Sequence, residues 1–289
     1  MEIILKQVEH RYQPNTPFER LALYDLNLHI PSSTFLAIIG HTGSGKSTII
    51  QHFNALLKPT SGQITIGDRT IEANRKEKEL KPIRKKVGVV FQFPEHQLFE
   101  ETIEKDICFG PLNFGVKEEE AKKRARELIK LVGLSEDLLE RSPFDLSGGQ
   151  MRRVAIAGIL AMDPEVLILD EPTAGLDPRG RKEIMEMIYT LHKQKNLTTI
   201  LVTHSMEDAA YYADQVVVMN KGSIAMKGSP KEIFSRYEEL KGYGLDVPES
   251  LSFMLKVQEQ FGLKMSEPAL TFEEVVSQVK ALMLEGDGT

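Results

Sequence analysis

The chain has 289 residues, of which 41% are hydrophobic and 27% charged, and its formal net charge is −6. This length suffices to bury a domain core, while the mild acidity gives no support for a nucleic-acid-binding protein, which usually carries a basic patch. A single cysteine, Cys108, excludes an internal disulfide framework and favours a reducing compartment. Because no apolar run approaches the roughly 20 residues of a membrane-spanning helix, any work at a membrane would require another, spanning protein.

The first part of the chain has the pattern of β-strands. Residues 3–8 and 21–30 predict two strands, and a short apolar, partly β-branched run predicts a buried strand at residues 34–39. Residues 48–57 predict a helix that is stopped by Pro59.

The loop at residues 40–47, between that strand and that helix, matches the phosphate-binding template G-x-x-x-x-G-K-[ST] at every specified position. Its glycines let successive N–H groups point inward, and the following helix adds its positive end. Lys46 is expected to reach the β- and γ-phosphates of a nucleotide, and the Ser47 hydroxyl to bind Mg²⁺. The residues expected to bind the nucleotide here are Gly40, His41, Thr42, Gly43, Ser44, Gly45, Lys46, Ser47 and Thr48.

The middle of the chain predicts two strands and then helices. Residues 62–68 predict a hairpin strand, and residues 87–92 predict a buried strand. Helical periodicity extends from about residue 102 to residue 160. Within residues 117–131, glutamates stand four positions before basic residues, which favours an exposed helix, and Gly133 is placed to end it.

Two adjacent carboxylates follow the apolar strand predicted at residues 166–169. Side chains alternate along a strand, so Asp170 and Glu171 point in different directions and need not share a role. Asp170 is expected beside Ser47, where it would hold Mg²⁺ through a water. Glu171 is expected to face the attacking water as general base. A pair of solvated acids is the alternative, and the phosphate loop upstream disfavours it.

The remaining elements predict the fold class. A second apolar strand at residues 198–202 is joined to the first by a helix at 180–193, and alternation of this kind indicates a mostly parallel α/β sheet. Residues 216–226 predict a closing hairpin, and Ser229 begins a capping box that predicts another helix. Two helices at about 249–261 and 272–284, the second capped by Thr271, then form a small C-terminal appendage.

The segment Leu-Ser-Gly-Gly-Gln at residues 146–150 precedes a helix and is, on its chemistry alone, another start of a helix that could hold an anion. In order, the phosphate loop, this segment and the strand-end carboxylates resemble the nucleotide-binding subunits of ATP-binding cassette (ABC) transporters. The resemblance covers roughly the first four-fifths of the chain. It implies an α/β fold with a P-loop core of mostly parallel sheet, an N-terminal antiparallel β subdomain and an inserted α-helical subdomain at about residues 93–160.

The resemblance also implies roles for single residues. Tyr12 resembles the aromatic residue that stacks on adenine, with a strand-edge tyrosine as an even alternative. Gln92 matches the glutamine that contacts Mg²⁺ and water and reports to the membrane partner, and His204 matches the histidine that touches the γ-phosphate. The expected catalytic residues are Lys46, Gln92, Glu171 and His204. The expected Mg²⁺ ligands are Ser47, Gln92 and Asp170.

In such cassettes the signature segment of one subunit closes over the ATP that another subunit holds. The residues expected to do so here are Ser147, Gly148, Gly149 and Gln150. Asp177 lies in the loop that crosses to the other subunit, where Ala174 departs from the commoner Ser-Ala-Leu-Asp form and leaves its own role open. One chain therefore carries both halves of an ATP site and completes neither.

The segment Phe-Gln-Phe-Pro-Glu-His-Gln-Leu-Phe at residues 91–99 resembles the ATPases of energy-coupling factor transporters, as does the run at 146–158. His41 to Gly45 and Thr173 to Gly175 resemble the second of the two paralogous ATPases. We therefore expect a cassette at residues 1–235 and a dimerising helical extension at 236–289.

The resemblance implies a peripheral ATPase on the cytoplasmic face of the cell membrane, with ATP and Mg²⁺ as cofactors. It would power uptake of a vitamin or metal ion together with a paralogous ATPase, a transmembrane coupling subunit and a substrate-binding membrane subunit, and no nucleic acid partner is implied. A heterodimer is favoured and a homodimer stays open. The alternatives are the ATPase of an ordinary ABC importer, a soluble non-transport cassette and a regulatory cassette that binds nucleotide without cleaving it.

Overall fold

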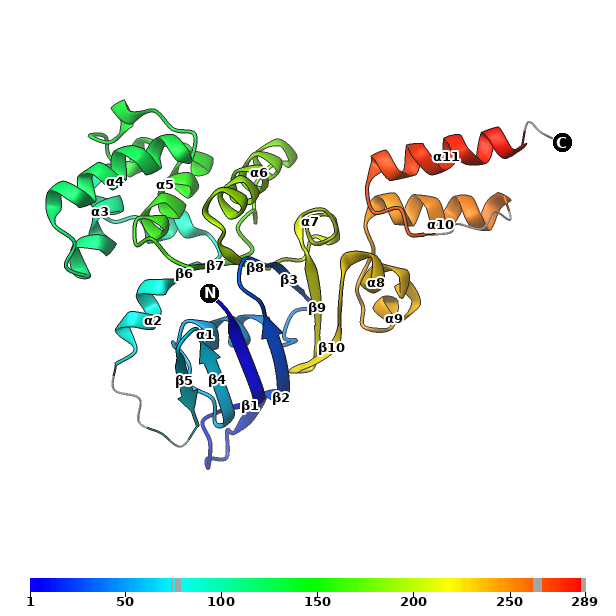
Figure 1. Ribbon diagram of the computed structural model, residues 1–289, viewed down its shortest axis with the longest axis horizontal. Coiled ribbons are helices and arrows are strands. Elements are labelled where there is room, and N and C mark those ends of the chain that lie inside the picture. Colours follow the sequence, from blue (N-terminus) through cyan, green and yellow to red (C-terminus); the bar gives the residue numbers. More distant parts are fainter. Residues whose placement is uncertain (74, 76–78, 262–266, 287–289) are drawn as a thin grey trace.

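The computed structural model describes residues 1–73, 75, 79–261 and 267–286, the last five of these by their backbone alone. The described residues form a four-stranded sheet, a six-stranded sheet, a group of helices inserted between strands of the larger sheet, and a helical C-terminal part (Figure 1). Of the predicted C-terminal extension, residues 262–266 and 287–289 lie outside the described residues.

The smaller sheet is antiparallel and has the strand order β2-β1-β4-β5. Its first two strands include the two predicted at residues 3–8 and 21–30, and burial alternates along much of each. Its strands are β1 (Ile3–Tyr12), β2 (Arg20–Ile30), β4 (Ser61–Ile66) and β5 (Arg69–Glu72).

The larger sheet has the order β10-β9-β3-β8-β7-β6 and is parallel except for β10. Because the carboxyl ends of parallel strands meet at one edge, the residues that follow β3, β8, β7 and β6 are brought together there. The strands are β3 (Phe35–Ile39), β6 (Val87–Val90), β7 (Val166–Asp170), β8 (Thr198–Val202), β9 (Gln215–Asn220) and β10 (Ser223–Gly228).

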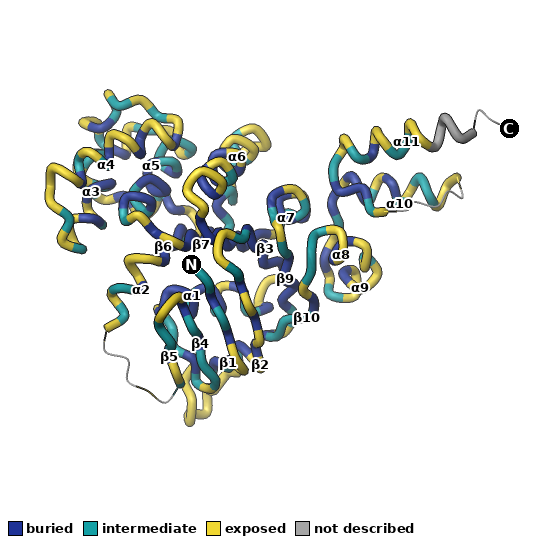
Figure 2. The backbone as a smooth tube through the Cα atoms, in the orientation of Figure 1, coloured by how far each residue is buried: buried dark blue, intermediate teal, exposed yellow. Residues whose placement is uncertain are grey.

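The apolar strands of the larger sheet are buried on both faces, as their continuous hydrophobic runs predicted (Figure 2). Along β7, Leu167 and Leu169 pack into the core with helices α5 (Gly148–Leu160) and α6 (Pro178–Lys195). Ile168 points the other way and packs with the antiparallel sheet and α1 (Lys46–Phe53). The strand that carries the two carboxylates is therefore fixed from both sides.

A helical group is inserted between β6 and β7 and lies apart from the antiparallel sheet (Figure 1). Its first helix, α3, begins after Thr102, whose side chain accepts a hydrogen bond from the Lys105 N–H. Two of the expected ion pairs of α4 are present, with Lys122 bonded to Glu118 at 2.7 Å and Arg124 bonded to Glu120 at 3.0 Å. The group contains α3 (Ile103–Asn113), α4 (Glu118–Leu131) and α5, with the single turns η1 (Pro94–Gln97), η2 (Glu136–Leu138) and η3 (Pro143–Asp145).

The C-terminal helices begin where the sequence predicted them. Ser229 forms the capping box of α8 with Glu232, and the Thr271 hydroxyl accepts a hydrogen bond from the Glu274 N–H at 3.2 Å. The helices are α8 (Pro230–Ser235), α9 (Tyr237–Gly242), α10 (Glu249–Phe261) and α11 (Phe272–Gly286). Leu240 and Leu251 still pack into the cluster that covers β9, and the division of the chain at residue 235 stays a prediction.

Three local expectations differ from the structure. The helix predicted to residue 57 ends at Phe53, because Ala55 takes a left-handed φ of 57° that no helix can continue through. Gln92 lies in an exposed bend beyond the end of β6 rather than in the strand. The sequence prediction also missed the short helices α2 (Lys81–Lys86) and α7 (Met206–Tyr212). Among the described helices, none is both long and apolar enough to cross a membrane.

Replacing Ile168 by alanine is expected to lower the free energy of unfolding by about 2–5 kcal/mol, because the site is fully buried between two packed layers and cannot collapse around the smaller side chain. Urea denaturation followed by circular dichroism measures the change. The control is Phe18→Ala, since Phe18 is 78% exposed and its loss should be close to neutral. Equal effects of the two substitutions would contradict the packing described for β7.

Candidate nucleotide-binding site

The loop between β3 and α1 is closed by its own lysine. The Lys46 ammonium donates hydrogen bonds to the carbonyl oxygens of Gly40 (2.6 Å) and His41 (3.0 Å) and is largely buried. Burial lowers the pKa of Lys46, while the negative charges of Glu171 and Asp170 oppose that shift. The Lys46 ammonium can therefore exchange its hydrogen bonds to these carbonyl oxygens for hydrogen bonds to a bound anion.

Gly40 is required by its surroundings. Its φ is 155°, and a Cβ added there would lie 2.4 Å from the carbonyl oxygen of Met219 and 2.6 Å from the Ser44 hydroxyl. Only a residue without a side chain lets the loop pass this close to β9.

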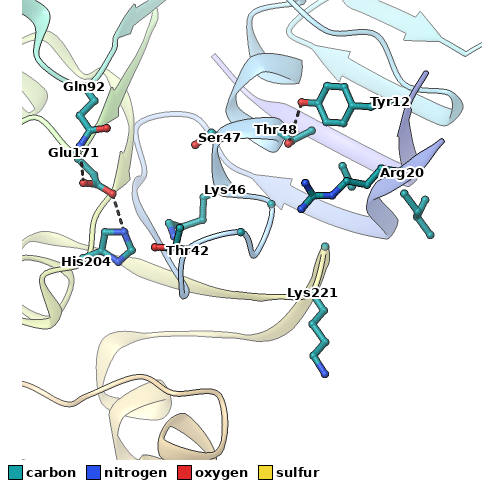
Figure 3. A pocket seen from close by; sticks show the side chains of 15 residues that line it. Tyr12, Arg20, Thr42, Lys46, Ser47, Thr48, Gln92, Glu171, His204 and Lys221 are labelled. Atoms are coloured by element: carbon teal, nitrogen blue, oxygen red, sulfur yellow. Dashed lines mark hydrogen bonds and ion pairs between the residues drawn. The ribbon is translucent and has the colours of Figure 1, made fainter. Parts of the chain in front are cut away.

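A cavity of about 620 Å³ opens over this loop (Figure 3). It brings together side chains from both sheets and from the edge where the parallel strands end. The predicted site residues that line it are Tyr12, Thr42, Gly43, Gly45, Lys46, Ser47, Thr48, Gln92, Glu171 and His204.

Glu171 lines the cavity, and two side chains contact its carboxylate. Nε2 of His204 is 2.8 Å from Oε1 of Glu171, and the amide of Gln92 donates to Oε2 at 3.3 Å (Figure 3). Glu171 has a positive φ of 48°, uncommon for a residue with a side chain. Its N–H donates to Val202 at 2.9 Å, and this bond anchors the turn that aims the carboxylate.

Asp170 is the last residue of β7 and is partly buried beside Glu171. Burial and the neighbouring charge of Glu171 raise the pKa of Asp170 to about 6, against the attraction of Lys46. Its negative charge is therefore incompletely compensated. Together with the oxygens of Ser47 and Gln92, it offers the oxygen donors that Mg²⁺ prefers, so these residues fit the ion that the sequence predicted.

Tyr12 is the last residue of β1, and its ring lines the cavity. The Tyr12 hydroxyl lies 3.2 Å from Oγ1 of Thr48, and the ring of His10 packs edge-on against it at 4.7 Å. Tyr12 is 39% exposed. Tyr12 thus stands at the end of a strand and also lines the cavity, so its position is compatible with both interpretations drawn from the sequence.

The signature segment does not line this cavity. Ser147 caps α5 in a capping box with Gln150, and Gly148 and Gly149 form the first turn of that helix. Asp177 caps α6 and accepts a hydrogen bond from the Gly180 N–H at 2.6 Å. The structure therefore places these predicted site residues together at the starts of α5 and α6, away from the phosphate loop of the same chain.

Five further residues line the cavity that the sequence did not predict. These are Arg20, Leu21, Ala22, Lys221 and Gly222. The Arg20 guanidinium extends toward the phosphate loop, while the Lys221 side chain points away from it (Figure 3). The only local signal was the predicted turn between β9 and β10. That turn reaches the site because the Gly222 N–H donates to the Ser44 carbonyl oxygen at 2.9 Å.

Comparison with known proteins identifies the family. A family model described as ABC transporter matches residues 23–174. The chain is 64% identical over 285 residues to the energy-coupling factor transporter ATP-binding protein EcfA2 of Bacillus licheniformis, covering 99% of each chain. It is also 64% identical to EcfA2 of Bacillus subtilis, over 95% of this chain and 99% of the relative. The chain belongs to the ABC transporter ATPases. Within that family it belongs with the energy-coupling factor ATP-binding proteins.

Solved ABC ATPase structures share the fold. The structure of cbiO1 from Clostridium perfringens, described as part of the ABC transporter complex cbiONQ, has a TM-score of 0.73 and 39% identity, over 83% of this chain and 93% of that chain. A dimeric ATP-binding cassette bound to ADP and Pi has a TM-score of 0.69 and 32% identity, over 79% of this chain and 98% of that one. The predicted family and fold class are confirmed.

Replacing Gly40 by alanine is expected to weaken ATP binding at least about tenfold, or roughly 1.4 kcal/mol, because the new methyl group would collide with the Met219 carbonyl and displace the loop. Titration of the isolated chain with a fluorescent ATP analogue measures the affinity. Gly242→Ala is the control, since a Cβ there meets nothing within 4 Å. Unchanged affinity in a folded Gly40→Ala protein would refute the steric account.

Replacing Asp170 by asparagine is expected to stabilise the nucleotide-free protein at neutral pH. The folded Asp170 has a pKa of about 6 against an ordinary value of 3.8, so the folded protein binds this proton more tightly than the unfolded chain does. The free energy of unfolding of the wild type therefore falls as the pH rises between these values. The gain from the substitution should be complete at about pH 7 and smaller at about pH 5.

Urea unfolding of the Asp170→Asn and wild-type proteins at these two pH values tests this expectation. Asp68→Asn, in an exposed turn, is the control and should behave like wild type at both. A stability gain of equal size at both pH values would contradict the idea that the ionised Asp170 carboxylate destabilises the folded protein.

Proposed function

We propose that this chain is the ATP-hydrolysing subunit of an energy-coupling factor membrane transporter and powers uptake of a vitamin or metal ion through separate transmembrane subunits. The observation that carries the proposal is the cavity in which a phosphate-binding loop faces a carboxylate contacted by His204 and Gln92. Similarity over the whole chain to energy-coupling factor ATP-binding proteins supports the choice of transporter.

The residues of the cavity divide the chemistry of ATP hydrolysis among them. Lys46 and the loop N–H groups hold the phosphates, and the charge they supply stabilises the transition state. Glu171 accepts the proton of the attacking water, while His204 holds one oxygen of its carboxylate. Mg²⁺, when held by Ser47, Gln92 and Asp170, would neutralise further phosphate charge. Tyr12 would stack on the adenine ring.

The ATP site is completed by a second ATPase subunit. Ser147, Gln150 and Asp177 lie at the starts of α5 and α6 and do not line the cavity of their own chain. We assign them, with Gly148 and Gly149, to the ATP held by the partner. A paralogous ATPase is the favoured partner and a homodimer is the alternative, with residues 236–289 holding the pair together.

The transmembrane coupling subunit would contact the segment at residues 91–99. Phe93 and Phe99 are exposed there, and Phe99 packs edge-on against Phe109 at 4.8 Å. Exposed aromatic side chains of this kind suit an apolar partner. The chain would thus lie peripherally on the cytoplasmic face of the membrane, and a separate membrane subunit would bind the transported compound.

Copurification with membrane subunits, followed by a phosphate-release assay on the assembled complex, tests the proposal. Recovery of an integral membrane partner and ATP-dependent phosphate release are expected. A chain that pairs with no membrane protein would refute the transport role, and a complete complex that binds ATP without cleaving it would make this a regulatory cassette.

Replacing Glu171 by glutamine in that complex is expected to slow phosphate release by about 10²- to 10⁴-fold, because the amide cannot accept the proton of water. ATP binding and subunit pairing should persist, since Lys46 and the signature segment are unaltered. Glu165→Gln is a matched control at the opposite end of β7, where Glu165 only pairs with Lys86 on the surface. Full steady-state hydrolysis by Glu171→Gln would remove Glu171 from this role.

A further inference from the structure

Arg152, on the signature helix α5, is only 2% exposed although it carries a charge. Its Nε and Nη2 donate to the two carboxylate oxygens of Glu95, at 3.1 Å and 2.7 Å. Its Nη1 donates to the backbone carbonyl oxygens of Pro172 and Ala174, both at 2.9 Å. The guanidinium thus has partners on every nitrogen.

These contacts join segments that are far apart in the sequence. Arg152 stands two residues after the signature residue Gln150. Glu95 lies in the turn η1, three residues after Gln92. Pro172 and Ala174 lie in the loop that leads from Glu171 to Asp177. One side chain therefore connects the signature helix, the segment of Gln92 and the loop after the general base.

The chemistry of the link makes it rigid. A guanidinium presents its donors in a planar fork that matches both oxygens of a carboxylate, whereas an ammonium group is a single point charge. Glu95 is itself mostly buried, with 13% of its side chain exposed, so water competes poorly for either partner. Burial would raise the pKa of Glu95, but the hydrogen bonds and charge of Arg152 outweigh it, and the pKa lies below its ordinary value.

The neighbouring arginine shows that position on the helix alone does not create this link. Arg153 donates to the carbonyl oxygen of Val132 and pairs with Glu183 at 3.0 Å. Those partners belong to the end of α4 and to α6, and none lies near Gln92 or Glu171 in the sequence.

We propose that Arg152 is a positioning residue that holds Gln92 and Glu171 in their catalytic arrangement by tying both of their segments to the signature helix. The proposal rests on the proposed function, in which the signature residues of this helix serve the ATP of the partner subunit. Displacement of α5 as the partner site closes is thereby transmitted to the hydrolytic residues of the chain's own site.

The test compares Arg152→Lys with wild type in the assembled transporter complex. Lysine keeps the charge but cannot reproduce the fork and both carbonyl contacts, so kcat for ATP hydrolysis is expected to fall on the order of tenfold to a hundredfold, as for a small misplacement of catalytic groups. KM for ATP should stay near the wild-type value, because Arg152 touches neither Lys46 nor Tyr12. Unchanged kcat per assembled complex would overturn the proposal.

Arg124→Lys is the matched control. Arg124 lies on α4 of the same helical group and also bonds one carboxylate, Glu120, and one backbone carbonyl, Ala161, but no motif segment. Its kcat and KM should equal those of wild type. An equal loss of kcat in both variants would make the effect a general consequence of loosening the helical group.

A double-mutant cycle with Glu95→Gln separates a joint role from two independent ones. If Arg152 acts on the Gln92 segment through Glu95, the double variant should lose little more kcat than Arg152→Lys alone. Losses that multiply would contradict the link. A wild-type complex without ATPase activity would instead refute the proposed function.

Hydrogen exchange of the isolated chain keeps the proposal testable if a variant complex fails to assemble. Arg152→Lys should raise exchange at residues 91–99 and 171–177 together and leave the phosphate loop at 40–47 unchanged. Faster exchange throughout the chain, or in only one of the two segments, would overturn the proposal.

Discussion

The site depends on the parallel alignment of four neighbouring strands. β3, β8, β7 and β6 run in one direction, so the residues after each strand meet at a single edge of the sheet. The phosphate loop, His204, Glu171 and Gln92 come from these four strand ends. Burial of the strands on both faces holds that edge in place, because a shift of any strand would expose one of two packed layers.

The charges in and beside the cavity favour the binding of an oppositely charged ligand. Lys46 is largely buried against carbonyl oxygens, and Asp170 is held beside Glu171 with a raised pKa. Neither arrangement stabilises the fold, since burial penalises each charged form. Both suit a nucleotide phosphate with its cation, which would supply the missing opposite charges. The local cost to stability and the capacity to bind have the same electrostatic origin.

The proposed division of the ATP site between two subunits rests on where the helices start. The signature residues and Asp177 cap α5 and α6 and lie outside the cavity, whereas Arg152, within α5, reaches back to the segments beside Gln92 and Glu171. The start of α5 therefore lies outside the cavity, while Arg152, within the same helix, bonds the segments next to Gln92 and Glu171 of its own chain. In the proposed ATPase pair, this arrangement would link the two ATP sites without any change in the phosphate loop itself.

The sequence alone determined the features whose physics is local. The phosphate loop was predictable because adjacent residues build it, the buried strands because apolar runs need cover on both faces, and the caps of α8 and α11 because each bond spans three residues. Only the tertiary structure decided the contacts of Glu171 with Gln92 and His204, the place of Arg20 and Gly222 at the cavity, and the burial of Arg152. These depend on strand order and on how helices pack across the sheet, and no local pattern encodes either.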